Sequence, residues 1–197
     1  MKDIEKLQPL THKGTQKITT DRLILRRFTA EDAKDVYIWA SNPNVVKYLS
    51  YQPHKSLQDS CDILKLWIDN YRNDNAYNWA IEYCGVCIGN IAVVLQDENG
   101  YICHLGWQID EKYWNKGIVT EAAKAVVDFL FAEVGCDKIE SAHDARNVGS
   151  GRVMQKIGMQ YEGCMRRYYY QKDGSIGDRN LYAILRSDWV HSECRLS

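Results

Sequence analysis

The feature that most constrains the fold is a change of hydrophobic period in the middle of the chain. Residues 78–83, 86–96 and 101–110 predict three consecutive strands, and Asn99-Gly100 between the last two predicts a two-residue hairpin turn. Apolar residues then recur at helical spacing over 119–130. Strands with one apolar face need a second layer to cover it. The sequence therefore predicts a mixed α/β or α+β domain built around one sheet.

The other elements are predicted from capping residues and from hydrophobic period. They are a strand over 18–28, a helix that begins after Thr29, a short helical piece from Pro43, a helix capped by Ser56, a strand over 137–144, a helix opened by Asn147 or Ser150, and two strands over 159–170 and 179–186 joined through Asp173-Gly174. We expect residues 1–17 to form a polar, loosely held tail and residues 191–197 a C-terminal tail.

Composition excludes several classes of protein. Hydrophobic residues make up 45% of the 197 residues, which argues against disorder. The net charge of -1 gives no basic stripe, so we expect neither nucleic acid nor a membrane surface as a partner. The apolar runs are too short to span a bilayer, and the N-terminus lacks the apolar segment of a secretory signal.

The seven cysteines have no regular spacing, which predicts reduced thiols in a cytoplasmic protein. Cys84 and Cys87 match C-x-x-C, but they flank a glycine between two predicted strands. A zinc site would need a second pair or nearby histidines, and a redox motif would need a helix start. We therefore interpret the pair as part of a turn and expect no metal.

A lone glycine, Gly117, lies where the third strand of the middle group leads into the helix, within the stretch "YWNKGIVTEAA" (113–123). The first turn of a helix leaves N–H groups unpaired at its positive end, where a diphosphate can accept them. Glycine allows close approach to the backbone, and Lys116 adds a charge. Neither G-x-x-x-x-G-K-[ST] nor G-x-G-x-x-G is present. The stretch alone leaves a phosphate site and a plain turn both open.

The stretch resembles the acetyl-CoA-binding turn of the GNAT acetyltransferase superfamily, Q/R-x-x-G-x-G/A, and more closely its RimJ/RimL-like branch. The matching segments follow the family's order from about Ile18 to Trp189: "TDRLILRRFTAEDA", "CIGNI", "HLGWQIDEKYWNKG", "NVGSGRVMQKIGMQYEG" and "DGSIGDRNLYAILRSDW". Val119 departs from the family's glycine or alanine, and Met159 replaces its usual phenylalanine.

The resemblance implies a single GNAT-type domain over residues 18–190. Its fold would be a strongly twisted mixed sheet of six or seven strands with about four helices. The family's fourth and fifth strands, here 101–110 and 137–144, would splay apart and leave a gap for the pantetheine arm. Gly106 is expected to mark a bulge in the first of these two strands.

The resemblance also implies acetyl-CoA as co-substrate, bound largely by backbone groups. An N–H of the fourth strand, around Trp107, Gln108 and Ile109, would hold the thioester carbonyl. Asn147 would contact the pantetheine arm and Ser150 would lie near the sulfur as a candidate general acid, although each is also a good helix N-cap. Tyrosines 168–170 are rival acids. The residues expected around the diphosphate are Trp114, Asn115, Lys116, Gly117, Ile118, Val119 and Thr120.

His104 is the first candidate for the base that takes the amine proton, because histidine titrates near neutral pH. It lies two residues before Gly106, where many relatives carry glutamate. A packed strand histidine is the alternative interpretation. Glu82 on the neighbouring strand is the second candidate, followed by His143 and Asp144.

The activity implied is acetyl transfer from acetyl-CoA to a primary amine, by direct attack in a ternary complex. The acceptor is a small-molecule amine or a protein N-terminus, and the sequence does not choose between them. Dimers are common among such proteins, so a homodimer is a further expectation. The alternative is a non-catalytic acyl-CoA-binding or regulatory module, which Val119 and the open choice of base favour.

Overall fold

The computed structural model describes residues 7–170, 172 and 174–193. Within these ranges one sheet of eight strands runs in the order β1-β2-β3-β4-β5-β6-β8-β7. Only β5 and β6 pair in parallel, and the other neighbours are antiparallel. The strands are β1 (Ile18–Thr19), β2 (Leu23–Arg26), β3 (Asn78–Tyr83), β4 (Val86–Gln96), β5 (Ile102–Ile109), β6 (Lys138–Asp144), β7 (Gln160–Tyr170) and β8 (Ile176–Leu185).

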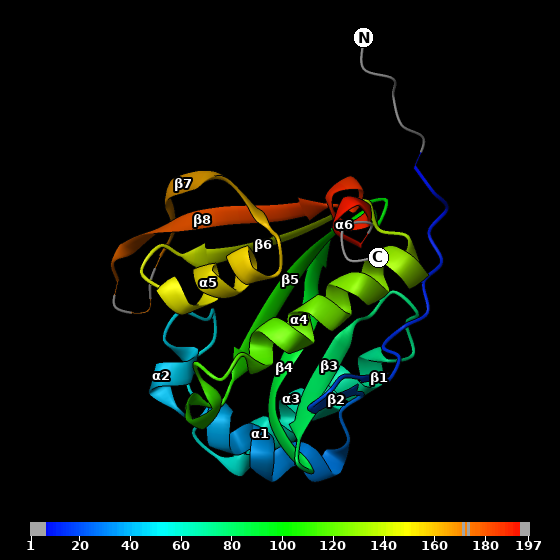
Figure 1. Ribbon diagram of the computed structural model, residues 1–197. Helices are drawn as coiled ribbons and strands as arrows, with labels where there is room; N and C mark the ends of the chain where they lie inside the picture. The colour runs from blue at the N-terminus through cyan, green and yellow to red at the C-terminus, as the bar shows by residue number, and fades with distance from the viewer. Residues whose placement is uncertain (1–6, 171, 173, 194–197) are drawn as a thin grey trace.

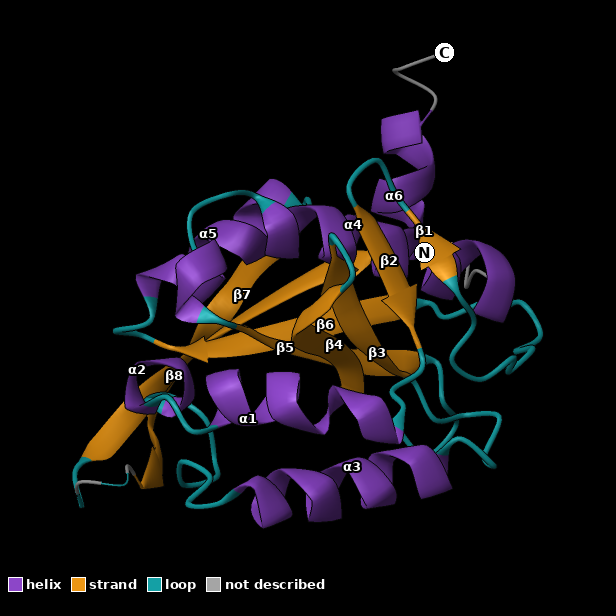
Figure 2. Cartoon of the chain, turned by 90° about the horizontal axis from the view of Figure 1, so that it is seen from below, coloured by secondary structure: helices purple, strands orange, loops and turns teal. Residues whose placement is uncertain are grey.

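Helices cover both faces of this sheet. Helices α1 and α3 lie on one face and α4 and α5 on the other, and we call these the α1–α3 face and the α4–α5 face (Figures 1 and 2). The helices are α1 (Ala33–Ala40), α2 (Pro43–Val46), α3 (Leu57–Asn70), α4 (Ile118–Phe129), α5 (Val148–Lys156) and α6 (Arg186–Glu193). None of them, in the part of the chain described, is long and apolar enough to cross a membrane.

The mixed α/β class is confirmed, with more elements than expected. The described ranges hold eight strands and six α-helices, where six or seven strands and about four helices were predicted. One extra strand arises because the predicted strand 18–28 folds back on itself. The Thr20 N–H donates to the Leu23 carbonyl at 3.0 Å, and the Leu23 N–H donates to Thr20 Oγ1 at 3.1 Å. This turn separates β1 from β2.

The amphipathic pattern of α4 positions the larger core. Ile118, Ala122 and Val126 are buried in one cluster with side chains of β3, β4 and β5, among them Trp79 and Leu105. Full burial of an aliphatic side chain stabilises a fold by roughly 1.5–3 kcal/mol. This packing fixes the start of α4 against the end of β5. A second cluster lies beneath α1 and α3, with Phe28, Val36, Trp39 and Leu64 against Ala80.

The two hairpin turns of the β3–β4–β5 meander differ from the prediction. Asn99-Gly100 was predicted to close a two-residue turn, but residues 97–101 form a longer loop. The Asp97 carboxylate stabilises this loop by accepting hydrogen bonds from the N–H groups of Asn99 at 3.2 Å and Ile102 at 2.7 Å. The two-residue turn is Cys84-Gly85, with φ of 50° and 78°.

The C-x-x-C pair is therefore part of a hairpin. Cys84 is exposed and Cys87 is buried, and burial raises the pKa of the Cys87 thiol to about 12. Among the residues that the structure describes, no group of three or more His, Cys, Asp or Glu side chains could hold a metal ion.

The segment before β1 is not loose where the structure describes it. The Thr11 N–H donates to the Val134 carbonyl at 2.8 Å, and Thr15 Oγ1 donates to the Ala76 carbonyl at 3.0 Å. Trp79 Nε1 donates to the Gln16 carbonyl at 2.6 Å. The expectation of a loosely held segment is thus wrong for residues 11–16. At the other end, α6 continues to Glu193, into the predicted tail. Residues 1–6, 171, 173 and 194–197 lie outside the described residues.

Candidate active site

Strands β5 and β6 separate shortly after they meet. They pair only from Ile102↔Lys138 to His104↔Glu140, although each strand continues beyond that point. Ser141 Oγ donates to the Leu105 carbonyl at 2.8 Å, and the ladder is not continued. The predicted splay of these two strands is confirmed, and the strands can be followed diverging in Figure 1.

The bulge near this splay lies on β4, which pairs with the other edge of β5, and not at Gly106. The register of β4 against β5 shifts between Val93 and Leu95, so Val94 is the extra residue. A Cβ at Gly106 would lie 3.1 Å from Cγ1 of Val94. Gly106 therefore accommodates the bulged side chain, which is a different role from the one predicted.

The splay leaves backbone groups of β5 facing the gap. The Leu105 carbonyl faces β6, since it accepts from Ser141. Backbone groups of alternate strand residues point the same way, so the Trp107 N–H also faces β6, where no ladder remains. An N–H of Trp107, Gln108 or Ile109 was predicted to hold a thioester carbonyl, but the same alternation turns the Gln108 N–H toward β4. The Ile109 carbonyl, further along, accepts from Trp114 Nε1 at 3.0 Å.

The turn before α4 has an unusual backbone. Asn115 and Gly117 both lie in the left-handed region, with φ of 59° and 74°, and α4 begins at Ile118. Left-handed residues next to a helix start turn successive N–H groups toward one point, which is an anion-binding arrangement. A side chain at Gly117 would meet only Arg22 Nη2, at 3.7 Å. The glycine is therefore required by the backbone conformation and not by lack of space.

Arg22 is a part of this turn that the sequence did not reveal. Its Nη1 donates to the Lys116 carbonyl at 3.1 Å, and its Nε pairs with Glu121 at 2.6 Å. Thr20 Oγ1 also donates to Glu121. Burial opposes ionisation of Glu121, but the Thr20 and Arg22 hydrogen bonds outweigh it and lower its pKa. The β1–β2 turn thus fixes the first turn of α4 and places a guanidinium beside it.

The other side chains of the turn differ in their exposure. Lys116 Nζ lies 5.3 Å from the centre of the Tyr113 ring. Val119, the residue that departs from the family pattern, packs against the main core. Thr120 is half-buried and Trp114 is exposed.

Asn147 and Ser150 lie at the start of α5, across the gap from the turn. Asn147 is the N-cap: its Oδ1 accepts the Ser150 N–H at 3.3 Å, and its Nδ2 donates to Ser150 Oγ at 3.1 Å. The capping role is therefore observed. Because Ser150 Oγ accepts from Asn147, its own O–H proton is left to donate elsewhere.

His104 lies on the opposite side of the sheet from α4. Its neighbours Cys103 and Leu105 point into the core beneath α4, so alternation puts His104, Gly106 and Gln108 on the α1–α3 face. Arg179 Nη2 on β8 lies 3.4 Å from His104 Nε2. A guanidinium only donates, so Nε2 is the accepting nitrogen of a neutral imidazole. Burial and the Arg179 charge both lower the pKa of His104, while Glu140 opposes them.

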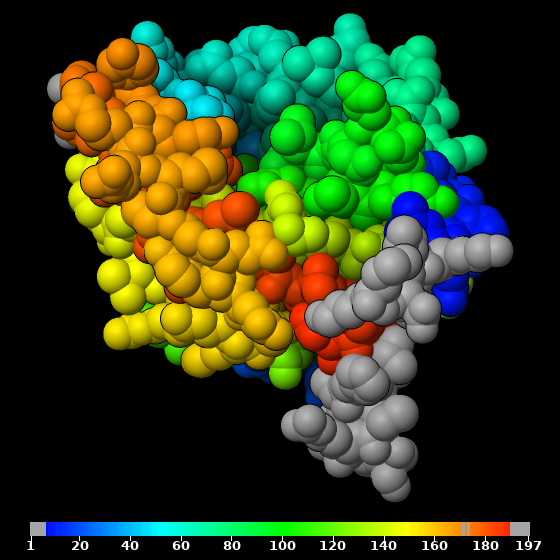
Figure 3. All heavy atoms as spheres, turned by 90° about the horizontal axis from the view of Figure 1, so that it is seen from above, coloured from blue at the N-terminus to red at the C-terminus, as the bar shows by residue number. Residues whose placement is uncertain are grey.

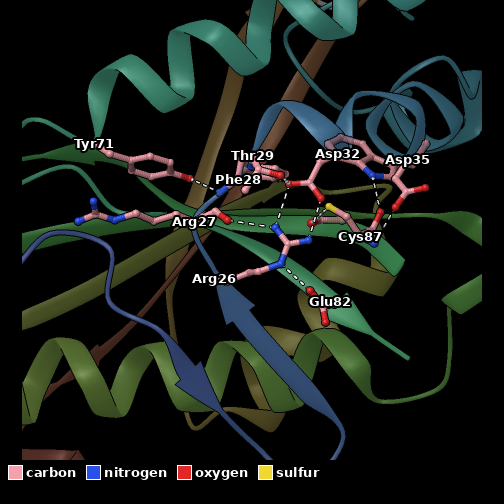
Figure 4. A network of polar contacts seen from close by, with 11 residues as sticks. Arg26, Arg27, Phe28, Thr29, Asp32, Asp35, Tyr71, Glu82 and Cys87 are labelled. Atoms are coloured by element: carbon pink, nitrogen blue, oxygen red, sulfur yellow. Dashed lines mark hydrogen bonds and ion pairs between the residues drawn. The ribbon is translucent and has the colours of Figure 1, made fainter. Parts of the chain in front are cut away.

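The structure does not bring Glu82 to His104. Glu82 pairs with Arg26 Nε at 2.5 Å, and the same guanidinium binds both carboxylate oxygens of Asp32 (Figure 4). Glu82 is opposite Cys87 on β4, whereas His104 is opposite Leu95. Cys87 and Leu95 are eight residues apart on β4, so Glu82 and His104 are separated by roughly 26 Å along the strands. Arg26 and Asp32 instead join β2 to the start of α1.

His143 and Asp144 face opposite sides of β6. His143 is buried against α5, where its Nε2 has no partner in the described structure and would lie 2.8 Å from a Cβ at Gly151. Asp144 is buried and binds Arg146, with Nη2 to Oδ2 at 2.9 Å. Tyr169 donates its hydroxyl to the same carboxylate at 2.6 Å. Of the three rival tyrosines, Tyr168 and Tyr170 are exposed.

The His104 side of the sheet is hollowed at the surface. Figure 3 shows the hollow between the orange β7–β8 strands and the green β4–β5 strands, with the cyan α2 region beside it. The segment after α2 reaches this place: the Tyr51 hydroxyl donates to Gln108 Oε1. Lys172 Nζ, from the β7–β8 connection, donates to the Val46 carbonyl at 2.7 Å and lies 5.8 Å from the Tyr51 ring centre.

Comparison with known proteins shows the family. The family model described as an acetyltransferase (GNAT) domain matches residues 22–160. The uncharacterized N-acetyltransferase YnaD of Bacillus subtilis is 31% identical over 185 residues, which cover 87% of this chain and 98% of that protein. The chain belongs to the GNAT acetyltransferase family. It is an acetyl-CoA-dependent N-acetyltransferase by this membership.

The RimJ/RimL-like branch is also confirmed. The [ribosomal protein uS5]-alanine N-acetyltransferase of Escherichia coli is 28% identical over 90 residues, which cover 46% of each chain. The fold matches that of RimL, a ribosomal L7/L12 alpha-N-protein acetyltransferase solved with coenzyme A, with a TM-score of 0.78 and 18% identity over 86% of this chain and 98% of that one.

Proposed function

We propose that this protein transfers the acetyl group of acetyl-CoA to a primary amine by direct attack in a ternary complex. The observation that carries the proposal is the splay of β5 and β6 directly after His104. The gap has the Gly117 turn and the start of α5 on the α4–α5 face. It has His104 and the hollow on the other face. Two substrates can therefore meet in the gap from opposite sides.

In the proposed complex the cofactor approaches along the α4–α5 face, as coenzyme A binding by the RimL neighbour supports. The N–H groups of Asn115 to Thr120 and the Arg22 guanidinium would hold the diphosphate. Asn147 would contact the pantetheine arm while it caps α5. The Trp107 N–H would donate to the thioester carbonyl, and one such donor can be worth about 3 kcal/mol in the transition state.

The acceptor would enter from the α1–α3 face. Its nitrogen attacks the thioester carbon, the C–S bond breaks, and the thiolate takes one proton. His104 would accept the proton lost by the amine, directly or through water. Its lowered pKa keeps the imidazole neutral, and so able to accept, near neutral pH. Ser150 is our candidate donor to the thiolate. We do not propose Glu82 as the base, because it pairs with Arg26 and lies far from His104 along the sheet.

The test is release of free thiol from acetyl-CoA in the presence of a panel of primary amines. We expect thiol release with at least one small amine or peptide N-terminus, and an acetylated amine as the second product. Tight CoA binding without thiol release from any acceptor would favour the non-catalytic acyl-CoA-binding module instead. We propose a cytoplasmic location for this reaction. A homodimer stays a prediction.

A further inference from the structure

The acceptor side of the gap carries more positive than negative charge. The carboxylates there already have cationic partners: Glu140 and Glu162 both bind Lys138 at 2.8 Å, and Asp144 pairs with Arg146 at 2.9 Å. Arg179 has no carboxylate partner among the described residues; its contacts there are His104 Nε2 and the Tyr168 ring, whose centre lies 5.5 Å away. In a chain with a net charge of -1, this excess is local.

Lys172 adds a second cation of the same kind. Its ammonium donates to a carbonyl, that of Val46, and lies over the Tyr51 ring; no carboxylate pairs with it in the ranges described. Tyr51 in turn binds Gln108, which shares a strand and a face with His104. Two cations from the β7–β8 hairpin therefore border the place where the acceptor amine is proposed to enter.

We propose that the acceptor carries a carboxylate close to its amine, and that Arg179 recognises this carboxylate with help from Lys172. This inference rests on the proposed function and names its substrate class. A guanidinium binds a carboxylate through two parallel hydrogen bonds, which is more favourable than its single 3.4 Å contact with an imidazole. The carboxylate would belong to a small amino acid or to an acidic residue beside a protein N-terminus.

Recognition by Arg179 would also change His104. In the described structure Arg179 donates to Nε2, the nitrogen that would have to accept the amine proton. A carboxylate that draws Arg179 away frees Nε2 and neutralises the charge that lowers the pKa of His104. Binding of an acidic acceptor would therefore make the base available, whereas a neutral or cationic amine would leave it engaged. Arg179 is in this sense a positioning residue as well as a binding residue.

The experiment compares acceptors in which a carboxylate is replaced by its amide. One pair is a free α-amino acid and its amide, and the other is a peptide beginning Ser-Asp-Asp and one beginning Ser-Asn-Asn. We expect kcat/KM to favour the acidic member of at least one pair by about tenfold or more. The pair that responds identifies the source of the carboxylate. Thiol release at equal kcat/KM within both pairs would overturn the inference and leave the acetyltransferase activity standing.

Variants assign the preference to residues. Arg179→Gln should reduce the preference to about twofold or less, Arg179→Lys should restore part of it, and Lys172→Gln, at an exposed position, should reduce it by a smaller factor. Arg72→Gln removes an equal charge just after the C-terminal end of α3 and should keep the wild-type preference. A preference that survives in both Arg179→Gln and Lys172→Gln would contradict the assignment. Absence of thiol release from every acceptor would instead refute the proposed function itself.

Discussion

The two sides of the β5–β6 gap are built in different ways. The α4–α5 side is mainly a backbone site: left-handed Asn115 and Gly117 lead into α4 within one local stretch of sequence, and Arg22 and Asn147 add side chains from other elements. The α1–α3 side is a side-chain site, assembled from β5, β8, the segment after α2 and the β7–β8 connection. A local backbone site suits a cofactor shared by a whole family, while a side-chain site can change its acceptor one residue at a time.

The largest effect is expected from removing the proposed base, His104, on the α1–α3 side. We expect His104→Ala to lower kcat/KM near neutral pH by about 10²–10⁴-fold, the usual range for general-base catalysis, while CoA still binds. Stopped-flow thiol release measures the loss of kcat/KM, and a CoA titration measures whether CoA still binds.

The pH profile adds a second check on His104. Wild-type activity should fall as the pH drops through the lowered pKa of His104, since protonation removes the accepting lone pair. That acid limb should be absent from the residual activity of His104→Ala. A variant with normal rate and an unchanged profile would show that His104 is only a packed strand residue.

The next largest effect is expected at the backbone site. Gly117→Val places a β-branched residue at φ 74°, which that side chain does not adopt without strain. The turn would rearrange, and CoA affinity should fall by about a hundredfold or more, as several charge-assisted hydrogen bonds are lost. Isothermal titration calorimetry measures this.

Gly117→Asn is the matched control, since asparagine tolerates the left-handed region. We expect it to keep most of the CoA affinity. If Gly117→Val binds CoA as tightly as the wild type, the turn is only a change of chain direction.

The smallest effect concerns Asn147, which lies on the α4–α5 side and is proposed to act through its side chain. Asn147→Ala removes the N-cap of α5 and should lower the free energy of unfolding by about 1 kcal/mol. Asn147→Asp keeps a capping oxygen but has no amide to donate. If Asn147→Asp retains stability and loses CoA affinity, the amide contacts the cofactor. If Asn147→Asp keeps both stability and CoA affinity, and only Asn147→Ala loses them, Asn147 has a structural role alone.

The sequence predicted the backbone site better than the side-chain site for physical reasons. Gly117, Asn147 and the α4 pattern are local signals, and the splay of β5 from β6 came with the family resemblance. Arg179 and Lys172 gave no signal, because only the packing of the β7–β8 hairpin brings them to His104 and Tyr51. Arg22 was missed for the same reason, since the β1–β2 turn that carries it was predicted as one continuous strand.

Two errors also have local causes. The sequence placed the tight hairpin turn at Asn99-Gly100, but the Asp97 carboxylate organises a longer loop there, and Cys84-Gly85 makes the tight turn instead. Gly106 was predicted to bulge, whereas it makes room for Val94, the bulged residue of the partner strand. In both places, interactions outside the motif decided the backbone.

The most direct test of two substrates on opposite sides of one gap is hydrogen exchange with and without coenzyme A. With coenzyme A bound, we expect slower exchange of backbone amides in residues 115–120, at the start of α5 and at Trp107, with little change in residues 47–55 and in β8. Protection confined to the β8 and 47–55 side, with no change at 115–120, would contradict it.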